Sequence, residues 1–146
     1  MTTIYVDGDA CPVKDEVFRA GAKRGLAVSV AAASMMRVPP GVTLAVAGSR
    51  EGAADDWIAE RAGPGDLVIT NDIPLASRAL KAGATAIDCR GKEFTDDNIG
   101  SALGMRDLMK HLRQVTGKEM GPKPFSDRDR RKFMSAFSAI LDRLAR

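Results

Sequence analysis

Four aspartates occupy positions that a parallel sheet would bring together. Asp7 directly follows an apolar segment, and Asp9 lies two residues further on. Asp72 follows a second apolar segment, and Asp55 lies at the start of a helical pattern that leads into it, with Asp56 expected to point away. In open α/β sheets, ligands bind outside the carboxyl ends of the strands. If the two apolar segments are neighbouring strands, Asp7 and Asp72 face each other across such a crevice.

Converging carboxylates favour a divalent-metal site. They repel each other unless a cation joins them, and hard oxygen ligands select Mg²⁺, Mn²⁺ or Ca²⁺ over zinc. The single histidine lies far along the chain from either cysteine, so the sequence contains no zinc-binding pattern. Each aspartate also has a purely structural interpretation as a helix cap or a first-turn acid, for example before Pro12 or Pro74. Their coincidence at strand ends favours the metal site for the set.

The elements that would position these aspartates alternate between strand and helix. Strands are predicted at 3–6, 26–33, 42–46, 67–70 and 84–88, and helices at 12–24, 53–61 and 74–82. The segment 67–70 shows no polar alternation, which is typical of a strand covered on both faces. Strands alternating with helices predict an α/β fold with a mainly parallel sheet.

The C-terminal part of the chain differs in charge and pattern. Residues 1–103 carry a formal charge of −3, whereas residues 104–146 carry +6. Helices are predicted at 96–115 and from Ser126 onward, where Asp129 completes the cap, and a Gly/Pro-rich linker at 117–124 joins them. Residues 95–146 thus form a basic helical extension of a single domain, 1–146, and are expected to pack on its body. Their charge indicates a polyanionic partner, with a solvated helix face as the alternative.

Composition excludes several other classes of protein. The 146 residues are 45% hydrophobic and 28% charged, which is typical of one globular domain. No apolar run approaches the ~18 residues of a membrane span, and the N-terminus does not resemble a secretion signal, so the cytoplasm is expected. Cys11 and Cys89 are expected to be free thiols. Aromatic residues are only 5% of the chain, which argues against a base-stacking platform.

Several motifs along the chain belong together. They are Ile4–Pro12 (IYVDGDACP), Arg37–Pro39 (RVP), Ala54–Asp56 (ADD) and Gly65–Ala76 (GDLVITNDIPLA), followed by tail segments within 98–107 and 121–130. The chain resembles the bacterial YaiI/YqxD family in this set, over nearly its whole length. That family is grouped with the PIN-like domains, many of which are metal-dependent ribonucleases. The resemblance implies a PIN-like three-layer sandwich with a mainly parallel sheet and C-terminal helices packed on it.

The resemblance also implies a chemistry and its residues. Asp7, Asp55 and Asp72 would hold Mg²⁺ or Mn²⁺, and Asp9 would complete the catalytic set or orient the attacking water. The reaction would be phosphodiester hydrolysis by a metal-activated water, with RNA favoured over DNA. Phosphate contacts are expected from a set of basic residues: Lys14, Arg37, Arg128, Arg130 and Arg131.

One acidic residue of the PIN-like pattern has no clear counterpart. PIN-like domains commonly place a further acid on a helix between the first strand and the region of Asp55. Asp15, Glu16 and Glu51 are the candidates in this chain.

Two other functions remain open. An incomplete acidic set is what a non-catalytic PIN-like module that binds nucleic acid or protein would show. The pair Asp7-x-Asp9 also resembles the motif of haloacid-dehalogenase phosphatases, in which Asp7 would be the nucleophile. The residues that follow, Ala10 and Cys11, depart from that motif.

Overall fold

A six-stranded sheet forms the centre of the molecule. The computed structural model describes residues 1–118 and 123–146. The strands lie in the order β3-β2-β1-β4-β5-β6. Their bounds are β1 (Thr3–Asp7), β2 (Ala27–Ala32), β3 (Val42–Val46), β4 (Leu67–Ile69), β5 (Thr85–Ile87) and β6 (Glu93–Phe94). The first five strands pair in parallel and β6 runs antiparallel to β5, so the predicted mainly parallel α/β fold is confirmed.

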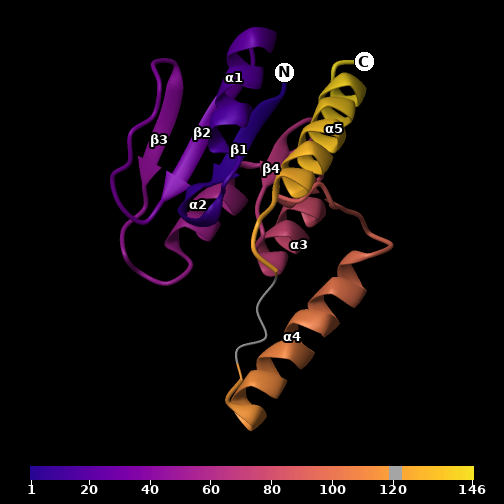
Figure 1. Ribbon diagram of the computed structural model, residues 1–146. Helices are drawn as coiled ribbons and strands as arrows, with labels where there is room; N and C mark the ends of the chain where they lie inside the picture. The colour runs from indigo at the N-terminus through magenta and orange to yellow at the C-terminus, as the bar shows by residue number, and fades with distance from the viewer. Residues whose placement is uncertain (119–122) are drawn as a thin grey trace.

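Helices cover both faces of this sheet (Figure 1). They are α1 (Lys14–Arg24), α2 (Ala53–Arg61), α3 (Ile73–Lys81), α4 (Ile99–Thr116) and α5 (Asp127–Leu144), with a short 3₁₀ turn, η1 (Gly8–Ala10), after β1. Helices α1 and α5 pack on one face, and α2 and α3 pack on the other. The three layers agree with the predicted sandwich.

The two cores explain the sequence patterns of the strands. On one face Phe133 and Phe137 are fully buried against alternate strand residues such as Ile4. On the other face Ile58 and Leu75 pack against the remaining strand residues. All three residues of β4 are buried, because β4 lies in the middle of the sheet with helices on both sides.

The two C-terminal helices behave differently. Helix α5 is part of the core, which confirms its predicted packing, and its Ser126–Asp129 capping box is present. Helix α4 buries Ala102 alone among its residues and extends away from the three layers (Figure 1). The expectation that both helices pack on the body is therefore wrong for most of α4. Of the predicted linker 117–124, residues 119–122 lie outside the described residues.

Several element boundaries differ from the predictions for local reasons. Helix α4 begins at Ile99 instead of residue 96, because Thr95 and Asn98 form a turn in which the Thr95 N–H donates to Asn98 Oδ1 at 2.9 Å. Helix α1 begins at Lys14 instead of Pro12, after η1. Strand β6 was not predicted, since two residues are too short to show a period. Over the described residues, none of the helices has the length and apolarity that crossing a bilayer requires.

Candidate functional site

The site begins where β1 and β4 end side by side. Val6 pairs with Ile69 in parallel register, so Asp7 and Thr70 follow at the same edge of the sheet. The Thr70 hydroxyl donates to Asp7 Oδ2 at 2.9 Å and accepts the N–H of Asp72 at 2.9 Å. Thr70 is buried and links the two aspartates. The sequence interpretation gave Thr70 no role, although its place at a strand end two residues before Asp72 was a signal.

Asp72 combines a structural and an electrostatic role. Its Oδ1 accepts the N–H of Leu75 at 2.9 Å and so caps α3, which confirms the capping interpretation for one of its two oxygens. Asp55 lies in the first turn of α2. Burial, followed by the negative charges of Asp72 and Asp7, raises the pKa of Asp55 to about 6. The two helix starts thus bring Asp55 and Asp72 together in front of Asp7.

Asp7 is perturbed in the same direction. Its burial raises its pKa above the ordinary value, the hydrogen bond from Thr70 opposes the shift, and the charges of Asp72 and Asp9 add to it. Within residues 1–118 and 123–146, however, no group of three or more Asp, Glu, His or Cys side chains is arranged to hold a metal ion. Asp72 therefore lies close enough to raise the pKa values of both Asp7 and Asp55, although the three carboxylates do not form a prearranged ligand set.

The other two aspartates of this region are directed elsewhere. Both Asp9 oxygens lie within hydrogen-bond distance of the Ala33 N–H, at 3.2 and 3.1 Å, so Asp9 fastens η1 to the end of β2. Asp56 forms ion pairs with Arg50 at 3.0 Å and with Arg78 at 2.7 Å. Hydrogen bonds from Arg78 and Arg50 lower the pKa of Asp56.

The three candidates for a further acid stay apart from this group. Asp15 and Glu51 are exposed on α1 and on the turn before α2. Glu16 forms an ion pair with Arg130 of α5. The charges that raise the pKa of Asp7 come from Asp72 and Asp9, and those that raise the pKa of Asp55 come from Asp72 and Asp7. The structure therefore adds none of the three candidates to the converging carboxylates.

Two of the expected phosphate-contacting residues have structural partners. The Lys14 ammonium donates to the carbonyls of Gly8 at 3.1 Å and Cys11 at 3.0 Å, and so holds the turn after Asp7. Arg130 is engaged by Glu16, which explains how a basic residue is accommodated near the start of α5 against the helix dipole.

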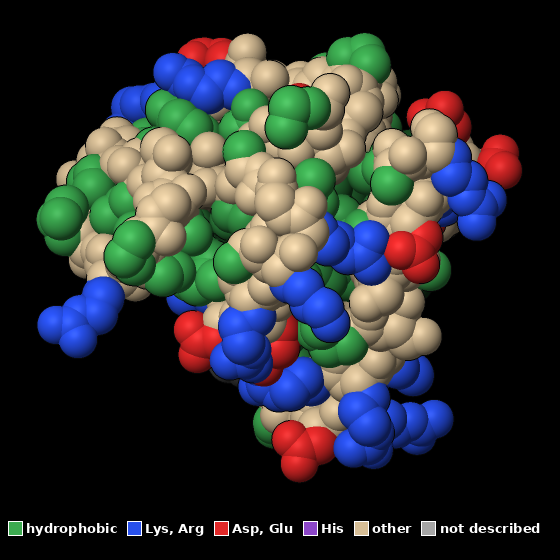
Figure 2. Space-filling model, turned by 90° about the horizontal axis from the view of Figure 1, so that it is seen from above, with side chains coloured by type: hydrophobic (Ala, Val, Ile, Leu, Met, Phe, Trp, Pro, Cys, Tyr) green, Lys and Arg blue, Asp and Glu red, His purple; other side chains and the backbone are tan. Residues whose placement is uncertain are grey.

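The remaining three expected phosphate contacts are exposed. Arg128 and Arg131 lie in the first turns of α5, and Arg37 lies in the loop between β2 and β3, beside Asp15 and Phe18 of α1. On the face that Figure 2 shows, Lys and Arg side chains form separate groups, most of them with Asp or Glu nearby. That face carries no single continuous basic surface.

Comparison with known proteins identifies a family and several relatives that resemble the chain along nearly its whole length. The family model described as "Uncharacterized BCR, YaiI/YqxD family" matches residues 5–143. The chain belongs to the YaiI/YqxD family. It is 53% identical over 148 residues to a UPF0178 protein of Rhodopseudomonas palustris (strain TIE-1), covering 100% of this chain and 94% of the relative. A UPF0178 protein of Caulobacter sp. (strain K31) is 51% identical over 143 residues, covering 97% of this chain and 95% of the relative. No solved structure matches the chain.

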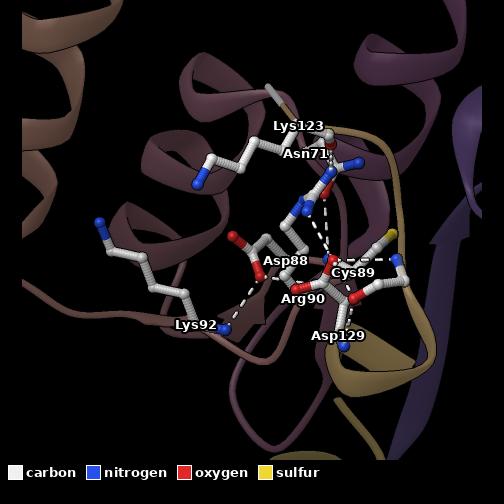
Figure 3. A network of polar contacts seen from close by, with 8 residues as sticks. Asn71, Asp88, Cys89, Arg90, Lys92, Lys123 and Asp129 are labelled. Carbon is white, nitrogen blue, oxygen red and sulfur yellow. Dashed lines mark hydrogen bonds and ion pairs between the residues drawn. The ribbon is translucent and has the colours of Figure 1, made fainter. Parts of the chain in front are cut away.

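In this YaiI/YqxD chain a polar network connects Asn71, the residue before Asp72, to the loop after β5 (Figure 3). Asn71, between Thr70 and Asp72, accepts the N–H of Cys89 at 3.0 Å. Arg90 then forms an ion pair with Asp129 at 2.7 Å. The network ties the start of α5 to the site edge, and the sequence interpretation found neither Asn71 nor Arg90.

Proposed function

We propose that this YaiI/YqxD protein is a divalent-metal-dependent nuclease that hydrolyses phosphodiester bonds, with RNA as the favoured substrate. The observation that carries the proposal is the convergence of Asp55 and Asp72 in front of Asp7, where burial, together with the charges of Asp72 and Asp7, raises the pKa of Asp55 to about 6. Such a grouping of negative charge opposes folding unless a cation neutralises it. The grouping of the family with PIN-like domains supports the same interpretation.

The donor set suits a hard divalent cation. Carboxylate oxygens are preferred ligands of Mg²⁺ and Mn²⁺, and Asp55, Asp72 and Asp7 would hold the ion. Because the described residues contain no prearranged group of three, binding would require these side chains to turn toward the ion. When bound, the cation supplies an activated water and neutralises phosphoryl charge.

The protein groups around the carboxylates have supporting roles in this proposal. Thr70 keeps one oxygen of Asp7 oriented through its hydroxyl. Asp9, fastened to Ala33, would hold the turn that follows Asp7. The pKa of about 6 belongs to Asp55 without a metal, and a bound cation would hold this carboxylate in its ionised form.

A nuclease assay tests this proposal directly. Labelled single-stranded RNA is incubated with the protein in Mn²⁺, Mg²⁺ or EDTA, and the products are separated by length. Cleavage is expected with a divalent cation, and Asp55→Asn should abolish it. Asp56→Asn is the matched control, because it makes the same change at the next residue, whose carboxylate faces Arg50 and Arg78. Equal cleavage by the two variants, or cleavage that persists in EDTA, contradicts the proposal.

The second candidate is a non-catalytic module that binds nucleic acid. The observation that favours it is that no three metal-ligating side chains of the described residues are arranged around a common point. Binding of RNA in both EDTA and Mn²⁺ without turnover would establish the module. The phosphatase alternative gains no support, since Asp9, its acid–base residue, is directed to Ala33.

A further inference from the structure

A cavity of about 590 Å³ lies beside the carboxylates, between α4 and the loop that follows β5. Ala10, Asn71 and Ile73 form its wall on the sheet side. Asn71 and Ile73 are the chain neighbours of Asp72 on either side, so the cavity wall includes both residues next to this member of the carboxylate group. Its volume falls in the range of about 300–1,000 Å³ that is typical of sites for small organic groups.

One side of the cavity is apolar. Met105 and Met109 of α4 line it together with Phe94 and Phe125. Met105 lies on the part of α4 that extends away from the three layers, and it is 56% exposed. Methionine is polarizable and flexible, so it adapts its shape to a planar ligand.

The rim of the cavity is strongly basic. Arg90 and Lys92 contribute from the loop after β5, and Arg106 and Arg113 contribute from α4. Among the described lining residues the one carboxylate is that of Asp88. Its Oδ1 accepts the backbone N–H groups of Arg90 and Lys92, both at 2.9 Å, and so shapes their loop. Four cations against one acid give the cavity a net positive charge.

Most of this positive charge is available to a ligand. Arg90 is held by Asp129. Lys92 and Arg113 form no ion pair with any carboxylate of residues 1–118 and 123–146, and Arg106 reaches only the exposed Asp107, at 3.5 Å. Figure 3 shows the amines of Lys92 and Lys123 extending in the same direction, away from the Arg90–Asp129 pair.

We propose that this cavity binds one nucleotide of a single-stranded RNA, with the base against Met105 and Met109 and the neighbouring phosphates on Arg106 and Arg113. A nucleotide base is planar and has apolar faces, and it is flanked along the strand by anionic phosphates. These properties match the apolar wall of the cavity and its basic rim. The base must be unstacked to enter, which is the state that single strands provide. A low aromatic content excludes a platform for many bases, whereas one base needs one apolar wall. The inference rests on the proposed function, because the bound nucleotide would lead its chain toward Asp72.

The test measures binding without chemistry. Fluorescence anisotropy follows a labelled octamer of uridylate binding to the full chain in EDTA, over a range of salt concentrations. Arg113→Gln is compared with Lys110→Gln, which removes a positive charge from the same helix but does not line the cavity. Arg113→Gln should weaken binding about tenfold and lower the salt slope by about 0.7, the value for one contact to a single strand. Lys110→Gln should change affinity less than about twofold.

A second probe tests the apolar wall. An octamer of the same sugar–phosphate backbone without bases should bind the wild-type protein about tenfold more weakly than the uridylate octamer, because base contacts contribute on that scale. Equal affinity for the two probes, equal effects of the two variants, or no RNA binding at all would each overturn the inference.

These outcomes are separable from those of the nuclease assay. Binding that depends on Arg113, without cleavage in Mn²⁺, refutes the proposed function and supports the cavity. Cleavage and binding that are unchanged in Arg113→Gln refute the cavity and leave the proposed function standing.

Discussion

Replacing Asp55 by asparagine should stabilise the metal-free protein at neutral pH. The pKa of Asp55 rises from 3.8 to about 6, because burial and the charges of Asp72 and Asp7 disfavour its ionised form. That difference corresponds to at most about 3 kcal/mol at 1.36 kcal/mol per pH unit. Asp55 is half-buried, so solvent screening reduces the figure to on the order of 1 kcal/mol. Its favourable place in the first turn of α2, worth roughly 0.3–1 kcal/mol, lowers the net gain further.

The pH dependence distinguishes this effect from a change in packing. Below about pH 4 Asp55 is protonated in the folded and the unfolded chain, so wild type and Asp55→Asn should be equally stable. As the pH rises from about 4 to about 6, the unfolded chain ionises Asp55 before the folded protein does, and wild type loses stability relative to the variant. Above about pH 6 the difference in stability between wild type and Asp55→Asn should no longer change with pH.

Thermal unfolding in EDTA at pH 4 and pH 7 measures this difference. A net gain of about 0.5 kcal/mol corresponds to a rise in Tm of roughly 1–2 °C for a chain of this length. Addition of Mn²⁺ at one hundred times its Kd should stabilise wild type by about 2.7 kcal/mol and the variant much less. Asp56→Asn, which loses ion pairs with Arg50 and Arg78, should not stabilise. An Asp55→Asn protein that is less stable than wild type at pH 7, or that differs from it equally at both pH values, refutes the reasoning.

Three further predictions concern the scaffold. Treatment with hydrogen peroxide should form a disulfide between Cys11 and Cys89, because their sulfurs lie 3.5 Å apart. Mass spectrometry detects the loss of two hydrogens, and a protein that stays reduced contradicts this contact. Gly91→Ala should lower the free energy of unfolding, measured in urea, by about 2 kcal/mol or more, because Gly91 has φ +93° and a Cβ there would lie 2.7 Å from a backbone oxygen. Gly104→Ala, in open space on α4, should instead raise it by up to about 1 kcal/mol. Phe137→Ala should cost about 3–5 kcal/mol, since the ring is fully buried, and a small loss would show that α5 is not part of the folding unit.

The sequence by itself determined most of the order of elements. Strand and helix periods depend on neighbouring residues, so β1, β3, α2 and the capping box at Ser126 were predicted close to their observed places. The uninterrupted apolar character of 67–70 indicated a strand covered on both faces, and β4 is one. The sequence predicted the approach of Asp7 to Asp72 only on the condition that their two strands are neighbours, and the structure meets that condition by pairing β1 with β4.

Tertiary structure alone decided which charges are available. Arg130 and Glu16 are 114 residues apart, and no local pattern shows that they pair and remove one expected phosphate contact. Asp9 has the spacing of a catalytic residue, yet its carboxylate faces the Ala33 N–H. Ion pairs and hydrogen bonds of this kind depend on how distant elements pack. The periodic pattern of residues within one segment does not show which other segment it will contact.

The cavity beside the carboxylates was likewise decided by packing. Apolar positions in 96–115 predict a helix that packs on the body, but α4 buries Ala102 alone among its residues and leaves Met105 on a cavity wall. Arg90 and Arg113 come from the loop after β5 and from α4, and only the folded chain places them on the same cavity. The sequence placed the aspartates at predicted strand ends and at a helix start, because those are local features. The basic groups that surround them come from elements far apart in the chain, and their positions depend on the three-dimensional packing.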